Sequence, residues 1–219
     1  MYPNSSDLTS PTQPSPEPEI RSSLFERVVS NWFVSWILIP AALIFFLHNF
    51  IFSAYHVVGS SMVQTLQDSD YLIISKVDRS LSLLTGKKYT ADRGQIIVFH
   101  YPKQPELDFV KRVVGLPGDR VTIKDGQVKV YTAEKPEGYN PDEGHAIQGS
   151  YTQGRNDGVR EDIPIDVIVP EGNVFVLGDN RMPYGSSDSR EWDFLPSEDI
   201  VGNVVLRLYP LNQLKIFND

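Results

Sequence analysis

Two polar residues of this chain could form a nucleophile and its base. Ser61 follows soon after a long apolar stretch, and Lys111 lies within an otherwise apolar run. A serine hydroxyl is a weak nucleophile until a neighbouring base takes its proton. A lysine serves as that base only if its pKa falls to about 7–8, because at the free value of about 10.4 roughly one lysine in 2,500 is neutral at pH 7. The chemistry therefore requires Lys111 to be buried beside Ser61.

The residues around Lys111 predict this burial. If the run 109–114 forms a strand, Phe109, Lys111 and Val113 share one face, and the amine lies among apolar neighbours whose desolvation lowers its pKa. Arg112 is excluded as the base because a guanidinium stays protonated. Taken alone, Lys111 is more often a surface lysine with a packed stem, and a serine such as Ser61 more often a turn or cap residue.

Other catalytic groups have less support. The Gly-x-Ser-x-Gly elbow of many hydrolases is absent, and no histidine belongs to a recognisable triad block, although the sequence leaves open whether His56 or His100 lies near Ser61 in space. The absence of cysteine excludes disulfides, thiolate zinc sites and a cysteine nucleophile. The four histidines are scattered without metal-ligand spacing. We therefore expect no metal and no cofactor.

Three short blocks, in a fixed order, favour a catalytic Ser61–Lys111 pair over a surface lysine and a turn serine. They are residues 59–66 (GSSMVQTL), 109–119 (FVKRVVGLPGD), and 178–181 (GDNR) with 186–190 (SSDSR). Together they resemble the type I signal peptidases, membrane-anchored Ser–Lys proteases that cleave signal peptides from exported proteins, and the likeness covers most of the chain after the apolar stretch. The resemblance implies a serine endopeptidase with Ser61 as nucleophile and Lys111 as general base, acting through an acyl-enzyme. It also implies preprotein substrates with small residues at the first and third positions before the cut.

The resemblance implies further roles around the base. Ser186 would hydrogen-bond the lysine amine, and Asp188 with Arg181 or Arg190 would brace the site. Four residues separate Arg181 from Ser186, where the family usually has two. This insertion leaves the choice between Ser186 and Ser187 open.

The family pattern also places the oxyanion on the Ser61 backbone N–H, aided in some members by a hydroxyl two positions earlier. Here that position is Gly59, so the aid is missing. Gln64 stands where proline is usual, Gln95 where the family has aspartate, and Asp193 where glycine is common. None of these departures removes the nucleophile or the base.

The apolar stretch predicts a membrane helix over residues 32–53. Residues 32–52 carry no formal charge, and a helix of this length spans about 30 Å, the hydrocarbon thickness of a bilayer. Trp32, Trp36 and Tyr55 fit interfacial aromatic belts. A cleaved signal peptide is the alternative; it is disfavoured because the stretch is long and the preceding residues are acidic and Pro-rich.

The charge bias around this stretch predicts its orientation. Arg21 and Arg27 precede it, whereas the first basic residue after it is Lys76, which places the N-terminus in the cytoplasm. Residues 54–219 then form an extracytoplasmic domain in a periplasm, on an outer surface or in the lumen of an internal membrane. The lipid bilayer is thus an expected partner.

The rest of the chain predicts a mainly β protein. Residues 1–31 are Pro-rich and too poor in apolar side chains to fold, so we expect a disordered cytoplasmic tail. Short β-branched runs separated by turn signals predict an antiparallel β-sheet catalytic domain over 54–219. The runs are 71–77, 95–101, 109–114, 120–130, 174–177 and 201–209. A polar, Gly- and Pro-rich excursion is expected at about 132–164.

Two further points concern partners and alternatives. The net charge of −8 argues against nucleic acid. Leu81, Leu83 and Leu84 are expected to pack in the core rather than to dip into the membrane. Besides an active signal peptidase, the departures leave open a catalytically weak paralogue that binds signal sequences or a partner without cutting, or a protease of the same chemistry with narrower substrates.

Overall fold

The computed structural model describes residues 31–32, 34–86, 88–124, 127–145, 164–182 and 184–217. The chain divides into two compact units, Met1–Ile44 and Phe45–Asp219. Nearly all of the predicted tail and most of the polar excursion, residues 146–163, lie outside the described residues.

Helical segments follow one another through the predicted membrane stretch. They are the π-helix η1 (Val34–Leu38), the α-helix α2 (Ile39–Phe46) and the π-helix η2 (Leu47–Ile51). None of the helices in the described part of the chain is by itself long and apolar enough to cross a bilayer. The predicted span of 32–53 also runs past the last helical residue, because strand β1 begins at Phe52.

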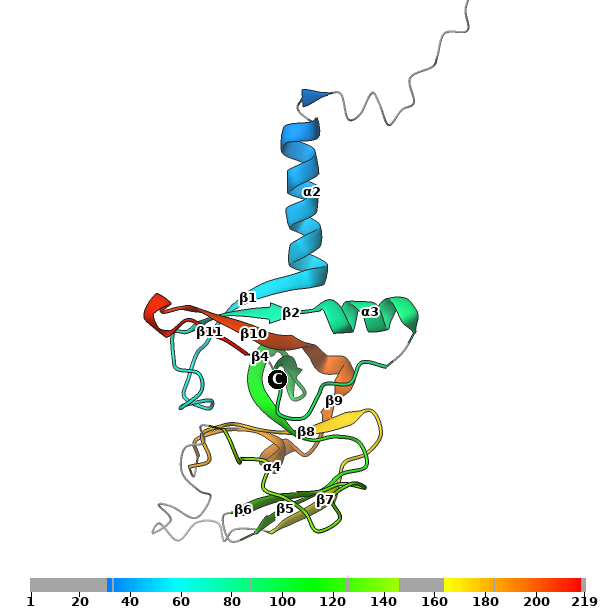
Figure 1. Ribbon diagram of the computed structural model, residues 1–219, viewed down its shortest axis with the longest axis vertical. Coiled ribbons are helices and arrows are strands. Elements are labelled where there is room, and N and C mark those ends of the chain that lie inside the picture. Colours follow the sequence, from blue (N-terminus) through cyan, green and yellow to red (C-terminus); the bar gives the residue numbers. More distant parts are fainter. Residues whose placement is uncertain are drawn as a thin grey trace, which may run out of the picture. The chain divides into compact units, whose positions relative to one another are not determined.

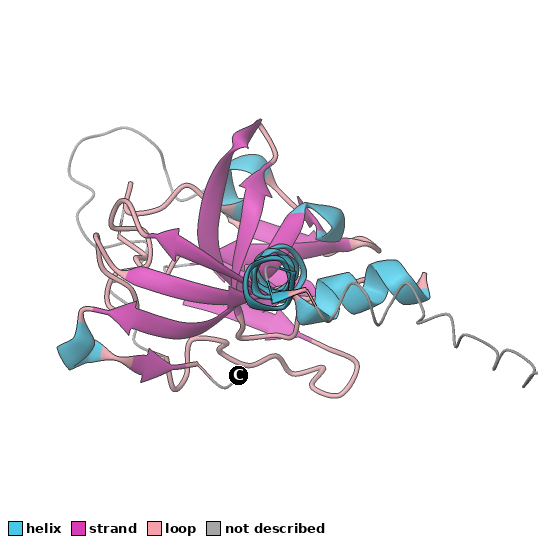
Figure 2. Cartoon of the chain, turned by 90° about the horizontal axis from the view of Figure 1, so that it is seen from above, coloured by secondary structure: helices cyan, strands magenta, loops and turns pink. Residues whose placement is uncertain are grey.

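The unit from Phe45 onward consists mainly of strands (Figures 1 and 2). The strands are β1 (Phe52–His56), β2 (Tyr71–Ser75), β3 (Ile96–Tyr101), β4 (Gln104–Gly115), β5 (Arg120–Lys124), β6 (Gln127–Tyr131), β7 (Ile165–Ile168), β8 (Asn173–Leu177), β9 (Leu195–Pro196), β10 (Ile200–Tyr209) and β11 (Lys215–Ile216). Short helices complete the unit: α3 (Val77–Thr85), α4 (Ser189–Trp192), η3 (Ser197–Asp199) and η4 (Leu211–Gln213).

The strands form two sheets in which all described pairs are antiparallel. The larger sheet has the order β1-β2-β10-β3-β4-β8-β9, with β11 added beside β10, and the smaller has the order β6-β5-β7. The prediction of a mainly antiparallel β domain is confirmed. Each predicted run contains a strand. The strand in the run 71–77 already ends at Ser75, and the run 120–130 contains β5 and most of β6.

Burial alternates along β2, β5 and β6, whereas residues 96–99 of β3, 111–115 of β4 and 174–177 of β8 are buried on both faces. One cluster joins Met62 and Leu66 to Leu72 and Ile74 of β2 and to Val98 of β3. A second lies on the opposite face of β3, where Ile97 and Phe99 pack with Trp192, and a third joins the smaller sheet to Phe175 and Leu177 of β8. The first cluster matters most for function because it carries the segment around Ser61.

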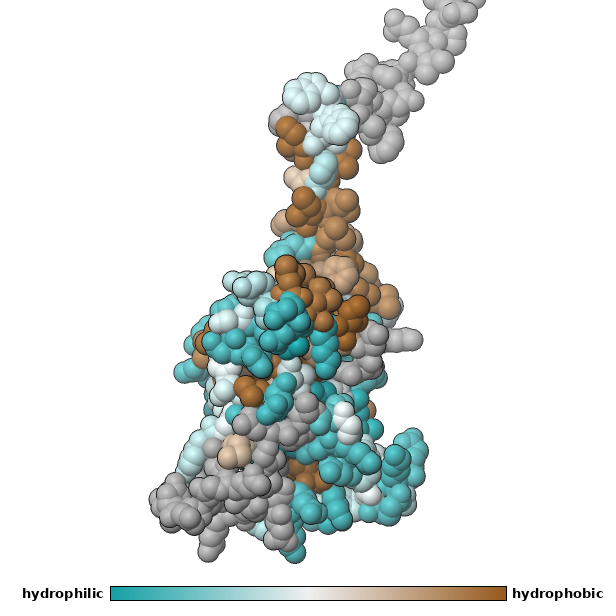
Figure 3. Space-filling model, turned by 60° about the vertical axis from the view of Figure 1, so that its left-hand side comes forward, coloured by the Kyte–Doolittle hydropathy of each residue, from teal (hydrophilic) through white to brown (hydrophobic). Residues whose placement is uncertain are grey.

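The packing predicted for the leucines of α3 is wrong. Leu81, Leu83 and Leu84 are 55%, 75% and 85% exposed. The helix turns polar side chains inward instead: Ser80 Oγ donates to the Phe50 carbonyl at 2.8 Å, and the Arg79 guanidinium donates to the Glu198 carbonyl at 3.4 Å. Figure 3 shows apolar side chains gathered around the junction of η2 and β1, where α3 also lies in contact with η2.

Candidate active site

Ser61 is positioned by the apolar residues that follow it. It lies in a loop between β1 and β2 that is closed at its base by the Val57 N–H donating to the Asp70 carbonyl, at 2.9 Å. Met62 and Leu66 are only 1% and 0% exposed, so burial of these two side chains fixes the loop on the core. Ser61 itself is half-buried and lines a cavity of about 460 Å³.

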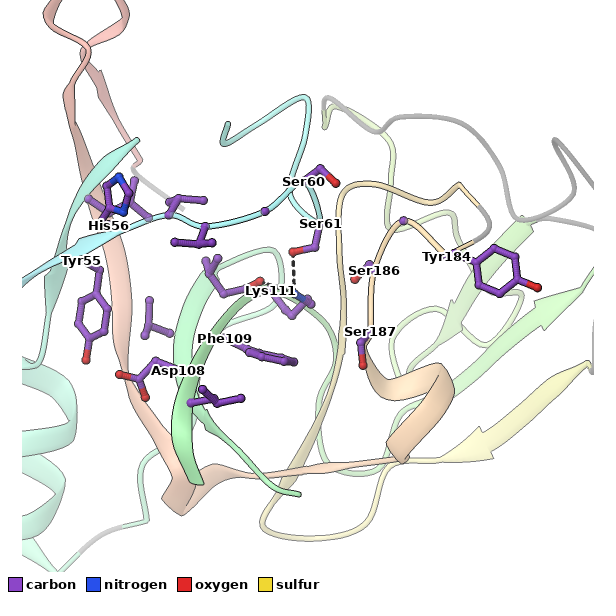
Figure 4. Close-up of a pocket in the computed structure, with 18 residues that line it drawn as sticks. Tyr55, His56, Ser60, Ser61, Asp108, Phe109, Lys111, Tyr184, Ser186 and Ser187 are labelled. Atoms are coloured by element: carbon purple, nitrogen blue, oxygen red, sulfur yellow. Dashed lines mark hydrogen bonds between the residues drawn. The ribbon is translucent and has the colours of Figure 1, made fainter. Parts of the chain in front are cut away.

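Lys111 reaches the same cavity from the middle of β4, where it is paired with Ile97 of β3. Its Nζ lies 2.8 Å from Ser61 Oγ and 2.9 Å from the Val110 carbonyl oxygen (Figure 4). The Phe109 ring is 5.1 Å from the amine, and the lysine is only 3% exposed. The predicted meeting of Ser61 with a buried Lys111 is therefore present in the structure.

Burial sets the electrostatics of this amine. Removal of water disfavours the charged form and lowers the pKa of Lys111 to about 8. The negative charge of Asp188 acts to raise this pKa, and the positive charge of Arg190 acts to lower it. At pH 7 a base with this pKa is neutral in about one molecule in ten, against about one in 3,000 for an exposed lysine. The pair can therefore transfer a proton from the hydroxyl to the amine near neutral pH.

A buried ion pair connects the three sequence blocks. The Arg112 guanidinium donates to both carboxylate oxygens of Asp179, at 2.9 and 2.6 Å, and Thr65 Oγ1 donates to the same carboxylate at 2.5 Å. Arg112 and Asp179 are 4% and 0% exposed. Each block supplies one member: Thr65 follows Ser61, Arg112 follows Lys111, and Asp179 follows Gly178. The network thus holds the nucleophile segment against the strand that carries the amine.

Gly178 and Asn180 bring the third block against the Ser61 backbone. The Asn180 N–H donates to the Ser61 carbonyl at 2.9 Å, and its side-chain amide donates to the Ser60 carbonyl at 3.0 Å. A Cβ at Gly178 would lie 2.5 Å from the Ser61 carbonyl oxygen and 2.2 Å from Ser186 Oγ. Glycine is required at 178 for this close approach.

Asp188 and Arg190 form a buried brace beside the amine. The Arg190 guanidinium donates to both oxygens of Asp188, at 2.7 and 2.8 Å, and the Gly178 N–H donates to the same carboxylate at 2.9 Å. Burial alone would raise the pKa of Asp188, but the hydrogen bond and charge of Arg190 lower it below its usual value. Arg181 makes a different ion pair, with Asp142 at 2.6 Å, and donates to the Gly178 carbonyl.

The two candidate serines of the inserted loop differ in their surroundings. Ser186 is 7% exposed and lines the cavity, and its Oγ has no hydrogen-bond partner in the part of the chain that the structure describes. Ser187 also lines the cavity, but its hydroxyl donates to Glu191 at 2.7 Å. Figure 4 shows Ser186 on the wall beside the Ser61–Lys111 pair. Of the two, Ser186 is the buried one, and the proximity of its hydroxyl contributes to the lowered pKa of Asp188.

The histidines have other contacts. His56 lines the cavity with its ring 4.9 Å from that of Tyr71, and His100 Nδ1 lies 2.7 Å from Asp108. Among the described residues, neither histidine is hydrogen-bonded to Ser61. The described residues also hold no group of three or more side chains suited to a metal ion.

Comparison with known proteins assigns the chain to a family. The family model described as "Signal peptidase, peptidase S26" matches residues 29–209. The chain belongs to the signal peptidase family.

Curated members of the signal peptidase family match over most of their length. Signal peptidase I of Bacillus caldolyticus is 36% identical over 183 residues, which cover 83% of this chain and 90% of that protein. Signal peptidase I U of Bacillus subtilis strain 168 is 34% identical over 191 residues, covering 87% and 93%. A crystal structure of a signal peptidase I from Enterococcus faecalis V583 is 28% identical, with a TM-score of 0.37, over 52% of this chain and 96% of that one.

The positions that depart from the signal peptidase pattern are accommodated locally. Gln95, in place of the family aspartate, accepts from the Asp92 N–H at 3.0 Å and donates to the Asp92 carboxylate at 3.1 Å. Asp193 stands where glycine is common and adopts φ +68° and ψ −118°, a region that glycine enters freely and that an L side chain enters at a cost, while its N–H donates to the Ser189 carbonyl at 3.0 Å. Gln64 is exposed.

Sequence reasoning missed the residues that hold the site together. From the sequence alone, Arg112 is named only as an excluded base, and Asp179 and Asn180 only as members of the third block. A usable signal was present, since a charged residue within an apolar strand must find a partner when it is buried. The partner of Arg181, Asp142, could not be named because it comes from the irregular segment after β6.

Proposed function

We propose that this chain is a serine endopeptidase that removes N-terminal signal peptides from exported preproteins, with Ser61 as nucleophile and Lys111 as general base. The observation that carries the proposal is the 2.8 Å approach of a buried lysine amine to a serine hydroxyl. A lysine with a pKa of about 8 is a suitable base near neutral pH. Family membership supports the peptidase chemistry.

In acylation, the Ser61 hydroxyl donates its proton to the neutral Lys111 amine as its oxygen attacks the scissile carbonyl. The protonated amine then donates that proton to the leaving nitrogen, which departs as the new N-terminus of the mature protein and leaves an acyl-enzyme on Ser61. Water, deprotonated by Lys111, hydrolyses the ester and regenerates the hydroxyl. One group thus serves as base and acid in both halves of the reaction.

The developing oxyanion is assigned to the Ser61 backbone N–H. Within the described residues this N–H has no hydrogen-bond partner, so it is available to a substrate oxygen. Gly59 offers no side-chain hydroxyl to assist it. The preceding residues of the substrate would lie along the apolar part of the cavity, which Val57, Leu72 and Val98 line, with small side chains at the first and third positions before the cut.

Asp188 and Arg190 are positioning residues in this proposal. Their mutual ion pair directs the carboxylate away from the amine and toward Arg190 and the Gly178 N–H. Ser186 Oγ would accept a hydrogen bond from the lysine ammonium when Lys111 is charged. Arg181 supports the same block through its hydrogen bond to the Gly178 carbonyl, at 2.6 Å.

The domain is proposed to be anchored to a membrane by residues 32–51, with a cytoplasmic N-terminus and an extracytoplasmic catalytic unit. Helical segments occupy Val34–Ile51, and the described apolar side chains there are largely exposed. The outward leucines of α3 would rest on the bilayer surface. Addition of a protease to intact membranes should leave the N-terminal tail uncut, and a tail digested from the outer face would overturn the orientation.

The function is tested by cleavage of a preprotein ending in Ala-x-Ala before the cut. The wild type should cut it, whereas Ser61→Ala and Lys111→Met should lose activity by more than about a thousandfold with unchanged circular dichroism spectra. A folded wild type that binds the preprotein without cutting it would favour the binding paralogue. Retained cleavage in Lys111→Met would show that another group is the base.

A further inference from the structure

The inserted loop between Arg181 and Ser186 adds an aromatic side chain to the rim of the active site. Tyr184 lines the cavity and is 75% exposed. Its ring has no aromatic partner among the described residues. A large exposed ring at the edge of a binding cavity has apolar area to offer a ligand.

The turn that carries Tyr184 is tied to the nucleophile through Asn180. The Gly185 N–H donates to the Met182 carbonyl at 2.9 Å, and the Met182 N–H donates to Asn180 Oδ1 at 3.2 Å. A Cβ at Gly185 would lie 2.5 Å from that same amide oxygen, so the turn lies directly on the Asn180 side chain. Because Asn180 also donates to the Ser61 carbonyl, the place of Tyr184 relative to Ser61 is built into the fold.

Tyr184 and the apolar part of the cavity lie on opposite sides of the reacting pair. In Figure 4, Tyr55, Asp108 and Phe109 are on one side of Ser61, and Tyr184 is on the other, beyond Ser186. In the proposed reaction the apolar side receives the residues before the cut. The substrate would therefore cross Ser61 at its scissile bond, and its residues after the cut would continue toward Tyr184.

We propose that Tyr184 contacts the first residues of the mature protein, just after the cut, and favours an apolar or aromatic side chain there. This inference rests on the proposed function and adds a specificity element on the leaving-group side. An aromatic contact of this kind contributes about 0.5–1.5 kcal/mol beyond its buried area, which corresponds to a preference of up to about tenfold.

The order of bond breaking gives the contact a kinetic signature. The residues after the cut depart with the leaving amine when the acyl-enzyme forms. Tyr184 can therefore change binding and acylation but not deacylation. A turn that served only to support Ser61 would change both steps, because the same serine carries the ester.

The test uses preproteins with one signal sequence and Ala or Phe placed, one position at a time, at the first three positions after the cut. In the wild type, kcat/KM should be about two- to tenfold higher for Phe than for Ala at one of these positions. Tyr184→Ala should abolish this ratio, and Tyr184→Phe should retain it. Tyr209→Ala, which removes a half-exposed tyrosine outside the cavity, should behave as wild type.

The same substrates are also titrated against full-length Ser61→Ala protein, with and without Tyr184→Ala, by fluorescence anisotropy. If Tyr184→Ala removes the preference for Phe in binding, the inference is supported even if the wild type cannot cut. A wild type that cannot cut would contradict only the peptidase function. An unchanged Phe-to-Ala ratio in Tyr184→Ala overturns the inference. So does an equal loss on every substrate with slowed deacylation, which would assign Tyr184 to support of Ser61.

Discussion

Hydration of the Lys111 amine is the quantity that the proposed mechanism depends on most, and Phe109→Ser changes it directly. The Phe109 ring is 5.1 Å from the amine and stacks on Tyr101, with ring centroids 4.4 Å apart. Serine would remove this apolar cover and admit water on the cavity side of the amine. Since burial is the main cause of the lowered pKa of Lys111, we expect the variant to raise it.

The size of the effect follows from the wild-type value. The pKa of Lys111 is lowered from 10.5 to about 8. If serine restores somewhat less than half of the lost hydration, the pKa rises to about 9, and the neutral fraction at pH 7 falls about tenfold. Cleavage at pH 7 should fall by about the same factor, whereas at pH 10 the neutral amine predominates in both proteins and this part of the loss should vanish.

The assay is kcat/KM for an Ala-x-Ala preprotein measured from pH 6 to 10.5, because this parameter reports ionisations of the free enzyme. The wild-type profile should rise with a midpoint near 8 and that of Phe109→Ser near 9. Phe109→Leu, which keeps the site dry, should stay near the wild-type midpoint. Thermal melts would check that all three proteins are folded. A Phe109→Ser profile with an unshifted midpoint, or a wild-type profile flat through pH 8, would refute the reasoning.

Three other variants probe the site. Lys111→Met should raise the free energy of unfolding by roughly 3 kcal/mol at pH 7, because the pKa of Lys111 is about 8 in the folded state against 10.5 in the unfolded state. The destabilisation that the lysine causes grows as the pH falls from 10.5 to 8 and is constant below pH 8. Denaturant melts at pH 7 and 10.5 should therefore show a smaller gain at the higher pH. Arg112→Leu leaves Asp179 buried without its cation and should lower the free energy of unfolding by about 3–5 kcal/mol, as denaturant melts would measure. Gly178→Ala should lower kcat by more than about tenfold, since its Cβ would lie 2.5 Å from the Ser61 carbonyl oxygen; an active Gly178→Ala protein would show that this close approach is dispensable.

The strands were predictable because their signal is local. Alternation along 109–114 is enough to place Lys111 on a face with Phe109, whatever the rest of the fold. The start of β1 was not predictable in the same way. Phe52 and Tyr55 belong to an apolar stretch, and apolar residues suit a bilayer and the pairing of β1 with β2 equally well.

The outward leucines of α3 show a second limit of local reasoning. A leucine-rich helix is expected to bury its apolar face, and composition gives no sign that Ser80 and Arg79 would face the protein instead. That choice depends on acceptors supplied from elsewhere, the carbonyls of Phe50 and Glu198. Such long-range acceptors have no signature in the sequence of the helix itself.

The neighbouring cations Lys111 and Arg112 differ in their partners, because the carboxylates of this site bind arginines and not the lysine amine. Neighbouring residues on a strand point to opposite faces, so Arg112 meets Asp179 while Lys111 enters the cavity. The amine makes its described hydrogen bonds to Ser61 Oγ and the Val110 carbonyl, and to no carboxylate. Asp188, whose charge acts to raise the pKa of Lys111, directs its oxygens to Arg190 and to a backbone N–H. Were that carboxylate to turn and pair with the amine, the pKa of Lys111 would rise and the base would be lost at neutral pH; Arg190 therefore acts on the reaction by holding Asp188.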